Sequence, residues 1–177
     1  MELVVPDVKY KISYIEAVKE FQADHSFPLM ERTWDKLSIS ELESNFEAHV
    51  ETVLSGARGE NLPEGFVPQT TFWLIDDGVY VGQVRIRHHI NHQFLKTIGG
   101  HIGYSIRPSK RGKGYGSNIL ELALPKAKEL GINRVLVTCD ATNIASRKII
   151  EKNGGVLEGR VPNPETGVDK LRFLIDA

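Results

Sequence analysis

The sequence predicts an α/β (α+β) fold in which helices cover a mixed sheet. Three observations predict it: two apolar stripes with a helical period in the first third of the chain, a change to a two-residue period at Thr71, and an alternation of strand and helix patterns after residue 100. The chain has 177 residues, of which 41% are hydrophobic and 25% are charged. Because this length is typical of one globular domain, we expect residues 1–177 to form a single domain.

The first third of the chain predicts two amphipathic helices. The first stripe consists of Ile12, Ile15, Val18 and Phe21, and the second of Leu42, Phe46, Val50, Val53 and Leu54. Ser40 and Glu43 have the spacing of a capping box, so we expect the second helix to begin at Ser40. Glycines and prolines spread over residues 56–68 then predict a surface connection.

The middle of the chain predicts a hairpin followed by a third strand. Residues 71–75 and 79–90 alternate with a period of two, and Asp77-Gly78 between them is typical of a tight primed turn. After a break at Gly99-Gly100, residues 101–106 predict another strand, which Pro108 ends.

The remaining elements alternate between helix and strand. They are a helix over 116–130, a strand over 134–139, a helix over 143–153, and two closing strands over 156–161 and 170–175. Pro125 lies inside the first of these helices, where a proline removes one helical hydrogen bond, so we expect a bend or a late break there.

Composition limits the classes of partner. The 22 basic and 23 acidic side chains give a formal net charge of -1, which creates no overall field for nucleic acid or an anionic membrane, and we expect neither as a partner. Cys139 is the only cysteine, so no internal disulfide can form. Residues 1–6 lack the pattern of a signal peptide and no apolar run approaches the roughly 18 residues of a membrane span, so we expect a cytoplasmic protein.

The segment over residues 107–117 predicts a phosphate site between a strand and a helix. Gly112, Gly114 and Gly116 remove every second Cβ, so the backbone can turn its N–H groups inward at the start of the helix, where the dipole favours an anion. Lys110, Arg111 and Lys113 add positive charge. The alternative is that the glycines only allow a tight turn.

Spacing narrows the identity of the phosphate ligand. No nucleoside-triphosphate loop occurs, and a dinucleotide fingerprint counted from Gly112 has Ser117 where its third glycine belongs. Asp140 is open to interpretation as a ribose-binding acid, which keeps a nicotinamide nucleotide as a rival ligand. The chain after this loop is too short for a doubly wound nucleotide fold, and the nearby cations favour a ligand with an additional phosphate.

Paired motifs in this region resemble the GNAT superfamily of N-acetyltransferases. Residues 111–116 match its acetyl-CoA signature, and residues 106–108 match the hydrophobic-Arg-Pro end of the preceding strand. Asn143, Ser146 and Gly154 match its later motif. Residues 3–6 and 138–146 are also similar to an uncharacterised bacterial branch of predicted acetyltransferases.

The resemblance implies a mixed, mostly antiparallel seven-stranded sheet with a central splayed parallel pair, flanked by about four helices. It implies an acyltransferase that uses acetyl-CoA, without a metal, to acetylate a primary amine of a small molecule or protein by direct attack. The protein would be a monomer or a homodimer. The pantetheine arm would enter between strands 101–106 and 134–139. The cofactor-binding residues would be Ile106, Arg107, Arg111, Gly112, Lys113, Gly114, Tyr115, Gly116, Ser117, Asn143 and Ser146.

The reaction needs a group that takes a proton from the amine, because an amine such as lysine has a pKa near 10.4. His88 and His89 are the candidates, and since alternate strand residues face opposite sides, one of them can face the acceptor. His101 is a further histidine, and Glu158 is a weaker candidate. The alternative is that these histidines are structural or exposed.

The group that protonates the departing thiolate is less defined. The family's usual tyrosine would lie seven residues after Asn143, at Ile150. This leaves protonation by solvent, protonation by Tyr104, or an acyl-CoA-binding sensor without turnover. We expect Cys139 to be a small core residue and not an acyl carrier. The acceptor pocket is expected between the two N-terminal helices and the connection after them, with Trp34 and Trp73 either in its wall or in the core.

Overall fold

The computed structural model describes residues 1–26, 33–60, 62 and 65–177. Within them, seven strands form one sheet in the order β1-β2-β3-β4-β5-β7-β6. The strands are β1 (Glu2–Val4), β2 (Gln69–Asp76), β3 (Val79–Arg87), β4 (Ile102–Ile106), β5 (Arg134–Asp140), β6 (Val156–Val161) and β7 (Lys170–Asp176). Only β4 and β5 pair in parallel among these strands, which confirms a mostly antiparallel mixed sheet.

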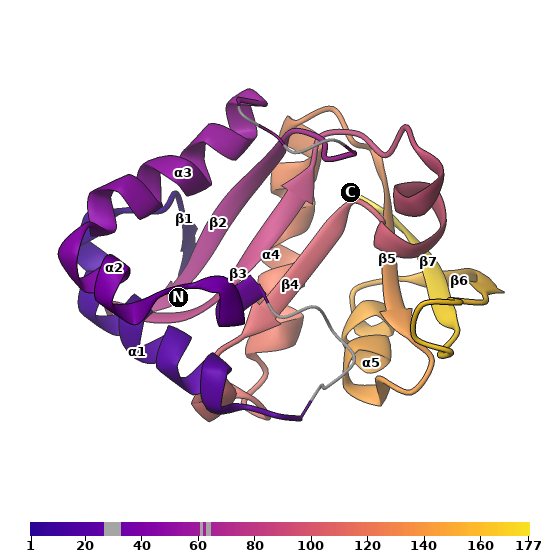
Figure 1. Cartoon of the computed structure of the whole chain (residues 1–177). Helices are drawn as coiled ribbons and strands as arrows, with labels where there is room; N and C mark the ends of the chain where they lie inside the picture. The colour runs from indigo at the N-terminus through magenta and orange to yellow at the C-terminus, as the bar shows by residue number, and fades with distance from the viewer. Residues whose placement is uncertain (27–32, 61, 63–64) are drawn as a thin grey trace.

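Helices cover both faces of the sheet (Figure 1). The described residues form α1 (Lys11–Ala23), α2 (Ile39–Ser44), α3 (Phe46–Arg58), α4 (Tyr115–Glu129) and α5 (Ile144–Lys152), together with short 3-10 and π turns. The N-terminal helices α1, α2 and α3 pack on one face, and α4 and α5 pack on the other. The five helices exceed the expected four because the second predicted stripe forms two of them.

The two faces bury different kinds of side chain. Under α1 and α3 lies an aromatic core, in which Tyr14 stacks on Trp73 with ring centroids 4.6 Å apart and Phe21 stacks on Trp34 at 4.2 Å. Under α4 and α5 the core is mainly aliphatic and includes the fully buried Ile150. The sheet therefore separates a rigid aromatic layer from a layer of branched side chains.

Three details predicted for the N-terminal helices are wrong: one core residue, the continuity of the second helix and the position of its cap. Ile12 is 78% exposed, because the buried stripe of α1 passes through Tyr14 and not through Ile12. The second helix is interrupted at Asn45, whose side chain accepts a hydrogen bond from the Ala48 amide and so starts a new helix. The predicted cap is two residues late, since Ser38 and not Ser40 accepts from the Glu41 amide.

Other boundaries differ less. The strand predicted to reach Ile90 ends at Arg87, and β1 had no counterpart among the elements predicted from periodicity. The helix α4 continues past Pro125 to Glu129, so the proline does not end it. The hairpin is confirmed, since Asp77 and Gly78 both have the positive φ angles of a primed turn, 49° and 74°.

The parallel pair β4 and β5 is splayed. Their one registered pair is Ile102 with Val137, next to which the His101 amide donates to the Leu136 carbonyl and His101 Nδ1 accepts from the Leu136 amide. The strands meet at this end and diverge toward the other end, near α5 (Figure 1). This arrangement confirms the splayed central pair.

Candidate active site

Two glycines shape the loop between β4 and α4. Gly112 and Gly114 have φ angles of 74° and 86°, and a Cβ at either position would meet no atom within 4 Å. Gly114 immediately precedes the first turn of α4. Within the described residues, the N–H groups of 112–116 donate to no protein acceptor, so they form a set of free donors at a helix N-terminus. Such a surface favours an anion.

The third glycine of the motif has a different role. A Cβ on Gly116 would lie 2.5 Å from Cδ1 of Ile149 on α5, closer than carbon atoms approach without displacement. Gly116 therefore allows α4 and α5 to pack closely, and it is Gly112 and Gly114 that set the conformation of the loop.

Acidic side chains of α1 form ion pairs and hydrogen bonds with the start of the loop between β4 and α4. Arg107 is buried and pairs with Glu16 and Glu20, with N–O distances of 3.3 and 2.8 Å. Both the amide and the hydroxyl of Ser109 donate to Glu20 at 3.0 Å. Burial alone would raise the pKa of Glu20, but the hydrogen bonds from Arg107 and Ser109 outweigh it and hold this pKa below its usual value.

Arg111 is fixed in the same way. Its guanidinium lies 2.6 Å from Asp24 Oδ2 and donates to the Ile106 carbonyl at 3.1 Å. Burial opposes ionisation of Asp24, yet hydrogen bonds from Ser26 and Arg111 lower its pKa to about 2. These pairs orient Arg107 and Arg111 toward α1, whereas the exposed Lys113 donates to the Ser109 carbonyl at 3.2 Å. The contact of the two arginines with a cofactor stays a prediction.

Two further residues of the predicted site face the protein. The Tyr115 hydroxyl donates to Asp76 Oδ2 at 2.6 Å, which ties the start of α4 to the end of β2. Ser117 donates its amide to the Gly114 carbonyl and accepts from the Asn153 side chain. Their hydrogen bonds to Asp76 and Asn153 stabilise the start of α4. Their roles toward a ligand stay predictions.

The edge of β4 supplies further backbone donors and acceptors. The Arg87 amide donates to the His101 carbonyl and the Arg107 amide donates to the Val81 carbonyl, so the odd-numbered residues of β4 exchange hydrogen bonds with β3. Tyr104 and Ile106 then point their backbone groups toward β5, which has diverged at this point. An extended chain can pair with this edge as a strand would.

A hydroxyl pair lies on the α5 side of the splayed strands. Tyr104 Oη and Ser146 Oγ are 2.9 Å apart, and the Ser146 amide donates to the side chain of Asn143, which caps α5. Burial raises the pKa of Tyr104 to about 12, so its hydroxyl remains a proton donor at neutral pH. Ile150 is fully buried in the core.

Cys139 lies beside this pair on β5. It is 5% exposed, and burial raises the pKa of its thiol to about 11. A protonated, buried thiol is a weak nucleophile, which agrees with the expectation of a core residue.

A pocket of about 410 Å³ lies on the opposite face of the sheet, between the N-terminal helices and β2 and β3. Its described lining includes Tyr14, Trp34, Leu37, His49, Thr52, Val53, Ser55, Gly56, Glu60, Leu62, Phe66, Gln69, Thr71, Gln83 and Arg85. It occupies the place expected for an acceptor pocket. Trp34 contributes to both the wall and the aromatic core, whereas Trp73 is fully buried in the core.

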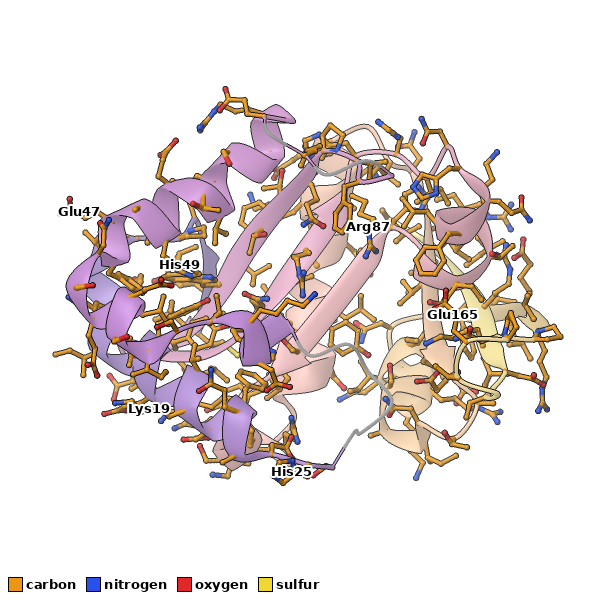
Figure 2. The ribbon with its side chains drawn as sticks, viewed as in Figure 1. Lys19, His25, Glu47, His49, Arg87 and Glu165 are labelled. Atoms are coloured by element: carbon orange, nitrogen blue, oxygen red, sulfur yellow. The ribbon has the colours of Figure 1, made fainter. Side chains whose placement is uncertain are left out.

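The histidine in this pocket is not one of those singled out from the sequence. His49 extends from the face of α3 that is turned to the sheet (Figure 2), its Nε2 lies 2.8 Å from the Tyr14 hydroxyl, and burial lowers its pKa. His88 Nε2 instead lies 2.8 Å from the Thr70 hydroxyl, and His89 is exposed. His49 follows Phe46 by three residues within the apolar stripe of α3, and this spacing is the sequence signal that could have indicated its inward orientation.

The described residues contain neither a cluster of metal-binding side chains nor a membrane-spanning helix. No three of their His, Cys, Asp and Glu side chains gather closely enough to hold a metal ion. No described helix has the length and apolar character needed to cross a bilayer.

Comparisons with known proteins agree with this geometry. A family model described as an acetyltransferase (GNAT) domain matches residues 14–156. The chain is 34% identical over 70 residues to the uncharacterized N-acetyltransferase YnaD of Bacillus subtilis (strain 168), a match that spans 37% of this chain and 41% of that protein.

Two solved structures share the fold. RimJ of Mycobacterium smegmatis in complex with CoA-disulfide has a TM-score of 0.71 at 20% identity, covering 99% of this chain and 81% of its own. The self-immunity acetyltransferase MccE in complex with acetyl-CoA and AMP has a TM-score of 0.67 at 18% identity, covering 99% and 91%. The family match contains the glycine loop, both splayed strands and the capped start of α5.

Proposed function

The chain belongs to the GNAT family of acetyltransferases, and from that premise we propose that it transfers the acetyl group of acetyl-CoA to a primary amine by direct attack. The observation that carries the proposal is the continuity of two backbone surfaces. The free amides of 112–116 lie at the start of α4, and the loop that contains them follows directly from the exposed edge of β4.

The first surface is suited to the diphosphate of coenzyme A. Amides of Gly112 to Gly116 would donate to its oxygens, and the positive end of the α4 dipole would add to the attraction. Lys110 and Lys113 would supply charge. The ion pairs of Arg107 and Arg111 with α1 support the cradle by fixing its position.

The second surface is suited to the pantetheine arm. Backbone groups of Tyr104 and Ile106 would pair with its amides, and the thioester would then lie where β4 and β5 separate. When the amine nitrogen attacks the thioester carbonyl, negative charge develops on the carbonyl oxygen, and the Ile106 amide would stabilise it. Collapse of this intermediate breaks the C–S bond and releases the thiolate of coenzyme A.

Two proton transfers accompany the attack. We assign protonation of the thiolate to Tyr104, whose hydroxyl is buried, protonated and paired with Ser146. Among the histidines, His49 is best placed to accept the proton of the amine, because it lines the pocket and is neutral at pH 7. His88 and His89 stay predictions, since neither lines this pocket.

A test measures release of the coenzyme A thiol from acetyl-CoA across a panel of primary amines. We expect release above the rate with water for at least one class of amine.

The fully buried Ile150 favours a second candidate, an acyl-CoA-binding sensor, because no acid can act from that position. Submicromolar binding of coenzyme A without turnover of any amine would select the sensor. Calorimetric preference for NADP over coenzyme A would overturn the assignment of the loop.

A further inference from the structure

One arginine in the pocket has no counter-ion within the described part of the chain. Arg85 lies on β3, and its side chain lines the pocket beside Thr71 and Gln83. Among the described residues its guanidinium makes neither an ion pair nor a hydrogen bond with another protein group. Its neighbour Arg87, by contrast, donates to the carbonyls of Gly99 and Gly100 (Figure 2). Arg85 is therefore the member of this strand whose charge is left for a ligand.

The described side chains next to Arg85 carry no negative charge: most are neutral, and Arg87, whose pKa burial and the charge of Arg85 lower to about 10, is the other cation of β3. Tyr14 of α1 and His49 of α3 line the same pocket, and burial raises the pKa of Tyr14 and lowers that of His49, which keeps both uncharged near pH 7. The carboxylate of Glu60, the acidic side chain among the described lining residues, is exposed and pairs with Arg58 at 2.9 Å. A half-buried cation without a partner is costly, and an anion from the ligand relieves that cost.

The rest of the pocket fits a small polar ligand. Thr71 and Gln83 are each 7% exposed, and their side chains have no hydrogen-bonded protein partner among the described residues. A volume of about 410 Å³ is within the range of small-molecule sites. Arg85 and Gln83 pair across the sheet with Gly103 and Ser105 of β4, the strand whose far edge carries the proposed thioester site.

We propose that the acceptor is a small amine that also carries a carboxylate or a phosphate group. Arg85 binds that anion with its planar fork of donors, while Gln83 and Thr71 hydrogen-bond to the remaining polar atoms. With the anion held on β3, the amine nitrogen extends toward β4. This inference rests on the proposed acetyl transfer and names the substrate class of the same site.

The experiment compares amines that differ only in their charge. Acetyl-CoA is supplied with free amino acids and their carboxamides, with aminoalkyl phosphonates and their neutral diesters, and with polyamines, and thiol release is followed. We expect kcat/KM for the anionic member of a pair to exceed that of its neutral partner by roughly tenfold or more, the contribution of a charge-assisted hydrogen bond. Preference for the neutral amines or for polyamines would overturn the proposal.

Variants locate the effect at one side chain. Arg85→Gln should raise KM for the anionic amine roughly tenfold to a hundredfold and leave KM of its neutral partner unchanged, and Arg85→Lys should restore part of the loss. Arg134→Gln, on a side chain that is 69% exposed, is the matched control and should change neither value. An equal loss for both amines in Arg85→Gln would contradict anion recognition.

A binding measurement separates the two proposals. The coenzyme A complex is titrated calorimetrically with N-acetylated amino acids and with the corresponding N-acetyl carboxamides. If no amine is turned over but the N-acetyl acids still bind and lose affinity in Arg85→Gln, acetyl transfer fails and the anion site stands. If amines are turned over but the acids bind no better than the carboxamides, acetyl transfer stands and the anion site fails.

Discussion

The loop after β4 and the pocket beside β2 and β3 present their polar groups in different ways. On the loop side, the donors are backbone amides held in a fixed conformation by Gly112 and Gly114 and fastened to α1 by ion pairs. On the pocket side, the polar groups are side chains such as His49 and Arg85, brought together from α3 and β3. In the proposed function, main-chain amides bind the cofactor that the whole family shares, whereas side chains bind the acceptor, which differs from one enzyme to another.

The largest expected effect concerns the backbone cradle. Gly114→Ala places a Cβ on a residue with a φ angle of 86° and should turn the loop amides away from the diphosphate. Loss of two charge-assisted hydrogen bonds, about 1.5 kcal/mol each, corresponds to roughly a hundredfold weaker binding of coenzyme A. Calorimetric titration of the wild type and the variant with coenzyme A measures this loss of affinity.

Gly131→Ala is the matched control for that change. Gly131 follows the other end of α4, has a φ angle of 82°, and likewise offers open space to an added Cβ, with no atom within 4 Å. The two substitutions should cost similar stability in urea unfolding, but only Gly114→Ala should weaken coenzyme A binding. Equal affinities of the two variants would remove the cradle from the binding site.

A second prediction separates the glycines of the motif from one another. Gly116→Ala brings a methyl group within 2.5 Å of Ile149 Cδ1, the far end of a flexible side chain that must move aside, so the free energy of unfolding should fall by about 1 kcal/mol, the lower end of the cost of overpacking. Affinity for coenzyme A should change far less than in Gly114→Ala, because the loop conformation is kept. Urea unfolding and calorimetry of the same preparation check both. A stable variant with lost affinity would instead mean that Gly116, like Gly114, sets the conformation of the loop.

A third prediction concerns the hydroxyl pair. Tyr104→Phe should lower kcat about tenfold without raising KM for acetyl-CoA, because a thiol with a pKa near 8.5 leaves readily even without an acid. Since the pKa of Tyr104 is about 12, the wild-type kcat should show no loss from this group up to about pH 10. Tyr10→Phe, the same chemical change beside the aromatic core, is the control. An unchanged kcat in Tyr104→Phe would assign protonation to solvent.

The same contrast explains what the sequence could predict. The loop was predicted because its chemistry depends on a contiguous spacing of glycines, and the splayed pair followed from the family resemblance. The anchors on α1 were not predicted, since Glu20 and Arg107 are joined by a contact across 87 residues that no local pattern encodes. His49 was missed because a histidine in an apolar stripe resembles core, and the break at Asn45 because the stripe continues across it.

The smallest change is expected at the ion pair that links the glycine loop to α1. In this pair, Asp24, the C-cap residue of α1, binds Arg111 of the loop. The pKa of Asp24 is about 2 in the folded protein and near 3.9 when unfolded, so its stabilisation is complete above about pH 5 and is lost as the pH falls toward 2. Asp24→Asn should therefore lower the free energy of unfolding by about 1 kcal/mol at pH 6, after solvent screening, and by almost nothing near pH 2. Urea unfolding at both pH values measures this, with Asp176→Asn, whose side chain is 93% exposed, as the control that should show no such dependence. A pH-independent difference in Asp24→Asn would mean that its role is packing, and the loop would then depend on Glu16 and Glu20 for its charged link to α1.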